Sequence, residues 1–241
     1  MILKKYTPFL VVIIQWAMLC GAVSQTHRET AIYTEDTWHY FVGTSAPPAN
    51  WNEPDFDESS WSSGPGGFGY GDDDDNTTIP NTLAVFFRKS FQVDELDQIV
   101  SAAIHGDYDD GFVAYINGVE ISRSYNMGTP GTTVPYDQTT EGDHEAVMYQ
   151  GGIPDVFILD NNDLDGLLQV GENVFAVEVH NVNLTSSDMS SLFFLSFELT
   201  AGVSYYGPTQ TGFTYPLNLP YPIYLLWSLT PTVRTSQVKI K

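Results

Sequence analysis

The stretch Gly106-Asp107-Tyr108-Asp109-Asp110-Gly111-Phe112-Val113-Ala114-Tyr115-Ile116-Asn117-Gly118-Val119-Glu120-Ile121-Ser122-Arg123 decides the fold class. Its Asn117-Gly118 pair is typical of a two-residue type I′ turn, because both central positions need positive φ, which glycine adopts freely and asparagine tolerates. Apolar β-branched and aromatic residues flank the pair on both sides, so we expect a tight β-hairpin. The chain around it is therefore expected to be built from strands.

Three carboxylates, Asp107, Asp109 and Asp110, crowd the loop before this hairpin. Such crowding is favourable only where backbone amides, a cation or open water take up the charge. The loop is therefore either a candidate cation site or a turn that satisfies its own carboxylates.

The first 24 residues have the features of a secretory signal peptide. Lys4 and Lys5 precede the apolar run from Phe9 to Leu19, and Ala22-Val23-Ser24 is a small-x-small cleavage pattern. An uncleaved membrane anchor is the alternative, but the run is short for a hydrocarbon core of about 30 Å. We expect a secreted or cell-surface protein with no membrane insertion after cleavage.

Composition excludes several classes of protein. The full chain of 241 residues has 30 acidic and 9 basic residues, a net charge of −21. Binding to a nucleic-acid backbone is therefore not expected. The only cysteine, Cys20, lies in the predicted leader, so disulfides are excluded from the exported protein.

Acidic residues lie between Glu29 and Glu198, and the chain from Thr200 to Lys241 has none. This change and the many prolines and tyrosines after it predict three segments: a signal peptide over residues 1–24, a β-domain over 25–201, and a linker or the truncated start of a following domain over 202–241.

Alternating apolar residues assign the strands and their buried faces. The clearest are Leu83 to Val93, Asn173 to Asn181 and Ser191 to Leu199; shorter ones are expected at Trp38 to Val42, Ile99 to His105, Phe112 to Asn117, Val119 to Arg123 and Val156 to Leu159. Glu178 and His180 share the face opposite the apolar one. Short alternating strands with Gly- and Pro-rich connections predict an all-β sandwich. The only helical candidate runs from Asn162 to Gln169.

Two long loops connect these strands, residues 43–80 and residues 124–154; the second is called the arch below. Long loops in a compact domain are usually functional or disordered. The first contains aromatic residues that disordered linkers lack, so we expect it to fold over the sandwich and bury Trp61 and Phe68.

Several motifs occur in a familiar order: Phe56-Asp57-Glu58-Ser59-Ser60-Trp61, Gly67-Phe68-Gly69-Tyr70-Gly71-Asp72, Phe87-Arg88-Lys89-Ser90-Phe91, the stretch from Asp109 to Glu120, the strand from Gly171 to Asn181, and Ser186-Ser187-Asp188. Together they resemble the galactose-binding-domain-like jelly roll of secreted bacterial proteins, over roughly Thr30 to Ala201. The resemblance implies a noncatalytic jelly-roll module of the kind found beside hydrolases and spore-coat-protein-H-like (CotH) kinase domains. Such modules often bind carbohydrate at loop ends and hold a structural calcium ion.

Calcium prefers carboxylate and carbonyl oxygens on loops. Candidate ligands are Asp72, Asp73, Asp74, Asp107, Asp109 and Asp110. No EF-hand spacing accompanies them. For Asp72 to Asp75 we expect a solvated charge run, with a metal site as the alternative. For Asp109 and Asp110 the alternatives are bonds from loop amides and an ion pair with Arg88 or Arg123.

Sugar recognition needs an aromatic platform and planar polar groups. Candidate ligand residues are Trp51, Tyr70, Tyr125, Arg88 and Arg123, of which Trp51 and Tyr125 lie in the least constrained surroundings. Each arginine has a structural ion pair as its alternative role.

No catalytic fingerprint is present. Glu178 and His180, with Asp188 nearby in sequence, imitate an acid–base cluster, but no nucleophile elbow, zinc spacing or P-loop accompanies them. We expect His180 to support a neighbouring loop through a hydrogen bond. The sequence predicts a secreted noncatalytic module that recognises carbohydrate or cell-surface glycan. The alternatives are a structural accessory to a missing kinase-like or hydrolase domain, and a small glycan-active hydrolase.

Overall fold

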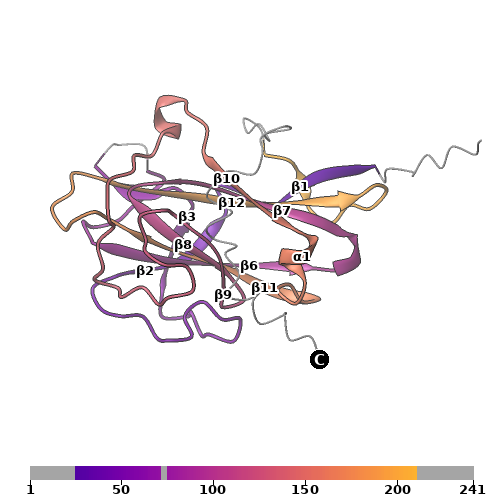
Figure 1. The fold of residues 1–241 in the computed structure, drawn as a ribbon, viewed down its shortest axis with the longest axis horizontal. Helices are drawn as coiled ribbons and strands as arrows, with labels where there is room; N and C mark the ends of the chain where they lie inside the picture. Colours follow the sequence, from indigo (N-terminus) through magenta and orange to yellow (C-terminus); the bar gives the residue numbers. More distant parts are fainter. Residues whose placement is uncertain (1–24, 72–74, 211–241) are drawn as a thin grey trace, which may run out of the picture.

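The chain folds as a β-sandwich, as the alternation predicts. A computed structural model describes residues 25–71 and 75–210. Figure 1 shows its two sheets as an upper and a lower layer. The predicted signal peptide, Asp72 to Asp74 and most of the predicted linker lie outside the described residues.

The first sheet contains, in order, β10 (Asp155–Asp160), β7 (Ile99–Tyr108), β12 (Met189–Thr200), β1 (Thr26–Ile32) and β13 (Gly207–Pro208); β4 (Phe68–Tyr70) also pairs with β12, and β5 (Thr77–Thr78) pairs with β4. The second sheet contains β3 (Ser62–Pro65), β2 (Thr37–Val42), β6 (Ala84–Val93), β11 (Gly171–His180), β8 (Gly111–Ile116) and β9 (Val119–Arg123). All pairings among these described strands are antiparallel except β4 with β5.

The hairpin at Asn117-Gly118 joins β8 to β9, as expected. Both turn residues have positive φ, 50° for Asn117 and 81° for Gly118. The Asn117 side chain also ties the turn to β11, because its Oδ1 accepts from the Val174 N–H at 2.9 Å. The turn therefore fixes both the hairpin and its place beside the central strand.

The core between the sheets is aromatic and aliphatic. Phe87, Val177 and Phe112 from the second sheet meet Leu195 and Phe197 from the first. These are the apolar faces that alternation assigned to β6, β11 and β12. Burying such side chains stabilises the fold by about 1.5 to 3 kcal/mol each before entropy is counted.

The opposite face of the second sheet is also buried, which alternation did not predict. Ala84, Phe86, Val174 and Ala176 form a second apolar cluster there with Trp51. The loop over residues 43–61 lies across this face, and so does the arch. Strands β6 and β11 are consequently covered on both sides, so polar residues on their outer face are buried too.

Two boundaries differ from expectation. Helix α1 (Asn161–Leu164) ends well before Gln169, because Asp165 is extended and Gly166 takes a φ of 73°. Residues 202–210, expected to begin a linker, pack against the sandwich: β13 pairs with β1, and the ring of Tyr206 lies 5.4 Å from that of Phe197.

The remaining helical elements of the described chain are two 3-10 turns, η1 (Leu96–Gln98) and η2 (Met148–Gln150). No helix among the described residues is long and apolar enough to cross a membrane.

Candidate functional site

Polar residues on the outer face of the second sheet hold the two long loops in place. Arg88 on β6 is 1% exposed, and its Nε donates to Glu58 of the first loop. Its Nη1 donates to the carbonyls of Trp51 and of Glu53, the latter at 3.0 Å. The guanidinium therefore helps to fix residues 51–58 and, because it is buried, is not open to a ligand.

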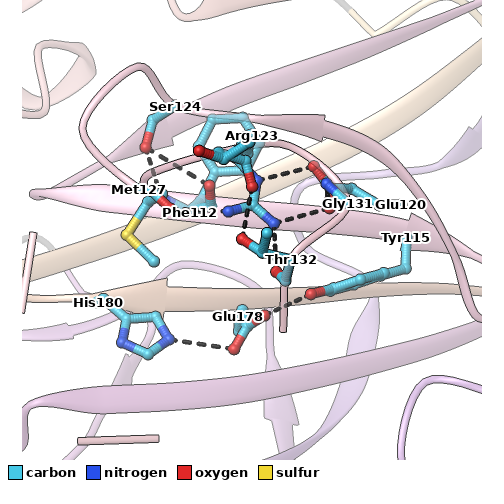
Figure 2. Close-up of polar contacts among 11 residues, drawn as sticks. Phe112, Tyr115, Glu120, Arg123, Ser124, Met127, Gly131, Thr132, Glu178 and His180 are labelled. Atoms are coloured by element: carbon cyan, nitrogen blue, oxygen red, sulfur yellow. Dashed lines mark hydrogen bonds and ion pairs between the residues drawn. The ribbon is translucent and has the colours of Figure 1, made fainter. Parts of the chain in front are cut away.

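Arg123 does the same for the arch (Figure 2). It makes a bidentate pair with Glu120, with both N–O distances 2.7 Å. It also donates to the carbonyls of Met127 at 2.7 Å and Thr132 at 2.8 Å. The alternative role expected for the two arginines, a structural ion pair, is the one observed. The acidic partners are Glu58 and Glu120, and the pairing with Asp109 or Asp110 that was considered as an alternative is not found.

Figure 2 also shows a chain of hydrogen bonds from Tyr115 on β8 through Glu178 to His180 on β11. The His180 Nε2 lies 3.1 Å from Glu178 Oε2, and its Nδ1 lies 2.9 Å from the carbonyl oxygen of Gln138 in the arch. Burial raises the pKa of the Tyr115 hydroxyl, and the Glu178 carboxylate adds to the rise, so this tyrosine stays a donor. His180 thus supports a neighbouring loop, as predicted.

Neither Glu178 nor His180 is accessible. Glu178 is almost fully buried and His180 completely so. Both ring nitrogens of His180 are engaged, the Nδ1 with the Gln138 carbonyl and the Nε2 with the Glu178 carboxylate, so no open position is left for a substrate. Asp188, expected near them from sequence, belongs to a different cluster.

The acidic stretch at the end of β7 and in the turn to β8 satisfies two of its three carboxylates with backbone amides. Asp107 accepts from the N–H groups of Val147 at 2.8 Å and Met148 at 2.9 Å. Burial nevertheless raises its pKa. Asp110 accepts from the N–H groups of His144 at 2.9 Å and Val182 at 2.7 Å. Both therefore fasten neighbouring loops, the alternative that was left open for Asp110.

Asp109 is the exception. It is buried, and within the described chain no backbone amide donates to its carboxylate. One of its oxygens, one from Glu145 in the arch and one from Asp188 before β12 lie within 4.8 Å of one another. Burial, and then the charges of Asp110, Asp188 and Glu145, raise the pKa of Asp109 to about 8. We call Asp109, Glu145 and Asp188 the carboxylate triad.

Tyr70 and Asn181 lie beside the triad. The Nδ2 of Asn181 donates to the Tyr70 hydroxyl at 3.1 Å and to the Asp188 carbonyl at 3.0 Å. Burial, with the charges of Asp109 and Asp188, raises the pKa of Tyr70. Tyr70 is thus a neutral hydrogen-bonding group in a buried setting and not the exposed sugar platform that was expected.

The aromatic side chains predicted to bind sugar differ in how much of each is exposed to solvent. Trp51 is 7% exposed, because it packs edge-on against Phe86 and Tyr115 and stacks on Trp61, so its expected place on the surface is wrong. Phe68 is buried as expected, and Trp61 is partly buried. Tyr125, at the start of the arch, is 61% exposed, and its hydroxyl donates to the Asp143 carbonyl at 3.1 Å.

No protein-family model and no curated protein matches the chain. Solved structures with a similar fold include Bacteroides uniformis β-glucuronidase (12% identity, TM-score 0.46, covering 71% of this chain and 18% of that one). Another is Bifidobacterium dentium β-glucuronidase complexed with coumarin-3-O-glucuronide (16% identity, TM-score 0.41, covering 64% of this chain and 20% of that one). A third is a glycosyl hydrolase family 2 member from Bacteroides cellulosilyticus (16% identity, TM-score 0.43, covering 70% of this chain and 20% of that one). The chain spans about a fifth of the length of these enzymes. This likeness identifies neither a family nor an activity.

Sequence reasoning missed Glu145 and Asp188 as neighbours of Asp109. They are far apart in the chain and follow no ligand spacing. The one usable signal was the crowding around Asp109, which required a partner that only the fold could reveal.

Proposed function

We propose that this domain is a noncatalytic binding module that recognises carbohydrate through the arch. The observation that carries the proposal is the contrast in exposure among the residues able to do chemistry. Arg88, Arg123, Glu178 and His180 are buried and used to fasten loops, whereas Tyr125 is exposed. A flat ring whose hydroxyl is already bonded suits the apolar face of a pyranose.

The arch is suited to present such a ring because many contacts hold its backbone. Arg123 fixes Met127 and Thr132, Asp107 fixes Val147 and Met148, and His180 fixes Gln138. A surface that is rigid before binding loses less entropy when its ligand arrives.

Glycan-array or affinity-gel binding tests this proposal. The full chain should bind at least one polysaccharide, and Tyr125→Ala should abolish that binding. Tyr149→Ala is the matched control, because Tyr149 is also an exposed tyrosine of the arch (47%) but lies near its other end, in η2. Equal binding by wild type and Tyr125→Ala would remove Tyr125 as the platform; turnover of chromogenic glycosides that depends on Glu178 would favour a hydrolase.

We extend the proposal to a calcium ion at the carboxylate triad. Three converging carboxylates, one of them buried without an amide donor, favour either a proton or a cation. Calcium bound only to the native state should raise the melting temperature. Asp109→Asn should reduce that rise, and an identical melting curve in millimolar calcium and in chelator would exclude the ion.

We propose a secreted or cell-surface location, which the signal peptide predicted over residues 1–24 supports. Detection of a mature N-terminus at Gln25 in the culture medium would test it. The module also suits a place beside a kinase-like or hydrolase domain; the DNA beyond the codon for Lys241 would test that arrangement.

A further inference from the structure

A groove opens at the end of the sandwich opposite the triad. It has a volume of about 380 Å³ and lies between η1 and helix α1 with the turn that follows it; its lining residues include Leu96, Asp97, Asn161, Asn162 and Asp165. Figure 1 shows α1 in the right-hand half of the molecule. This volume is in the lower part of the range of about 300 to 1,000 Å³ that small-molecule sites occupy.

The floor and the walls of the groove differ in chemistry. Ile99, Leu164 and Leu168 form an apolar floor and are themselves nearly buried. The side chains of the polar wall residues, Asp97, Asn161, Asn162 and Asp165, make no hydrogen bond to another described residue. The groove therefore combines an apolar base with free planar acceptors and donors, the groups that bind vicinal hydroxyls.

Both walls are fixed before any ligand arrives. The Asp160 carboxylate caps α1 by accepting from the N–H groups of Asn162 at 2.8 Å and Asp163 at 3.1 Å. The turn after α1 is tied to the hairpin, because Asn117 Nδ2 donates to the Leu167 carbonyl at 2.9 Å. On the other wall, the Gln98 side chain of η1 is bonded to Thr200 on β12.

The charge of the groove selects among ligands. Asp97 and Asp165 place two carboxylates on its walls, and no basic residue lines it. An anionic ligand would meet like charges there, in a chain whose net charge is −21. Neutral sugars and amino sugars meet no such penalty.

We propose that this groove is a second ligand site, which takes a neutral or amino-sugar unit and rejects acidic sugars. The ligand class rests on the proposed carbohydrate function, but the site does not depend on Tyr125. Ile99 begins β7 and Tyr108 ends it, so the groove and the triad lie about 30 Å apart at 3.4 Å per residue.

Titration of the ¹⁵N-labelled full chain tests the proposal by NMR, with a chelator present so that no metal contributes. The probes are glucose, galactose, glucosamine and glucuronate. We expect saturable shifts of the Asn162 and Gly166 amides with at least one of the first three, and none with glucuronate at the same millimolar concentration. No saturable shift at these amides with any probe, or equal binding of glucuronate, would overturn the inference.

Variants separate this site from the arch. Asp97→Ala and Asp165→Ala should each weaken binding about fivefold, as expected for the loss of a hydrogen bond. The control Asp94→Ala changes an exposed carboxylate of the same connection outside the groove and should bind like wild type. If Tyr125→Ala abolishes glycan binding while the groove amides never shift, the proposed function stands and this inference fails.

Discussion

Without a divalent cation, the carboxylate triad should make the domain less stable as the pH rises. The pKa of Asp109 rises from 3.8 to about 8 on folding, mainly through burial and then through its acidic neighbours. The folded state therefore holds a proton that the unfolded state has lost. The stabilisation from this proton is complete below about pH 4 and is lost as the pH rises through about 8.

The size of the effect follows from the shift. Roughly four pH units at 1.36 kcal/mol each give an upper bound of about 5 to 6 kcal/mol. Glu145 is exposed and Asp188 is half-buried, so solvent screens part of the repulsion, and about 3 kcal/mol is the working figure. For a domain of this size that corresponds to roughly 6 to 12 °C in Tm.

The assay is thermal unfolding by circular dichroism from pH 5 to pH 9 in chelator. Asp109→Asn keeps the shape of the side chain but removes its charge, so its Tm relative to that of wild type should rise from pH 5 to about pH 8 and level off above that pH. Asp94→Asn is the control for simple loss of a surface charge. The Tm difference between Asp109→Asn and wild type isolates this group, because every other titration is common to both. Parallel Tm curves for wild type and Asp109→Asn would refute the reasoning.

Three further outcomes are expected. Arg88→Met should lower the free energy of unfolding, measured in urea, by about 3 to 5 kcal/mol, because it leaves buried carbonyls unpaired. Lys89→Met is the control: Lys89 makes one exposed bond to the Thr37 carbonyl, so its loss should cost under about 1 kcal/mol. Equal costs for the two variants would contradict this reasoning. Burial alone would raise the pKa of Glu29, but hydrogen bonds, among them those from the Tyr206 and Tyr205 amides, lower it to about 2. Glu29→Gln should therefore remove stability that wild type keeps above pH 4.5 and loses towards pH 2, measured as the difference between their acid unfolding curves. Burial lowers the pKa of His105 to about 3, so its NMR titration should show a neutral ring at pH 5; a midpoint near 6.5 would exclude the buried setting.

The strands with apolar alternation could be predicted, and those without it could not. The ranges for β6, β11 and β12 were right to within two residues at each end. Strand β1 was missed because Thr26–Ile32 is largely polar. Its Glu29 is buried only because the Tyr205 and Tyr206 amides reach it from the far end of the domain. Such a partner lies about 176 residues away and leaves no local pattern.

The partners of the crowded carboxylates could not be predicted. Crowding marked Asp107, Asp109 and Asp110 as carboxylates that need partners, and backbone amides supply them for Asp107 and Asp110. Which of them receives amides depends on where the arch and the loop before β12 cross the β7–β8 turn. The prediction that Trp51 is exposed was wrong for a related reason. Trp51 lies in a loop, but the loop itself forms a layer over the sheet and buries the ring.

The basic residues of the described chain are engaged in holding the fold together, and this bears on which ligand the surface can bind. The described chain contains four, and three of them, Arg88, Lys89 and Arg123, donate to backbone carbonyls of the first loop, of Thr37 and of the arch. The fourth, Arg28, lies 3.6 Å from Glu198. In so acidic a chain, and with no cysteine among the described residues, Arg88 and Arg123 help to hold the loops where a disulfide would otherwise serve. The described surface then has few positive groups to offer an anionic ligand, which is why neutral sugars are the class that both the arch and the groove should favour.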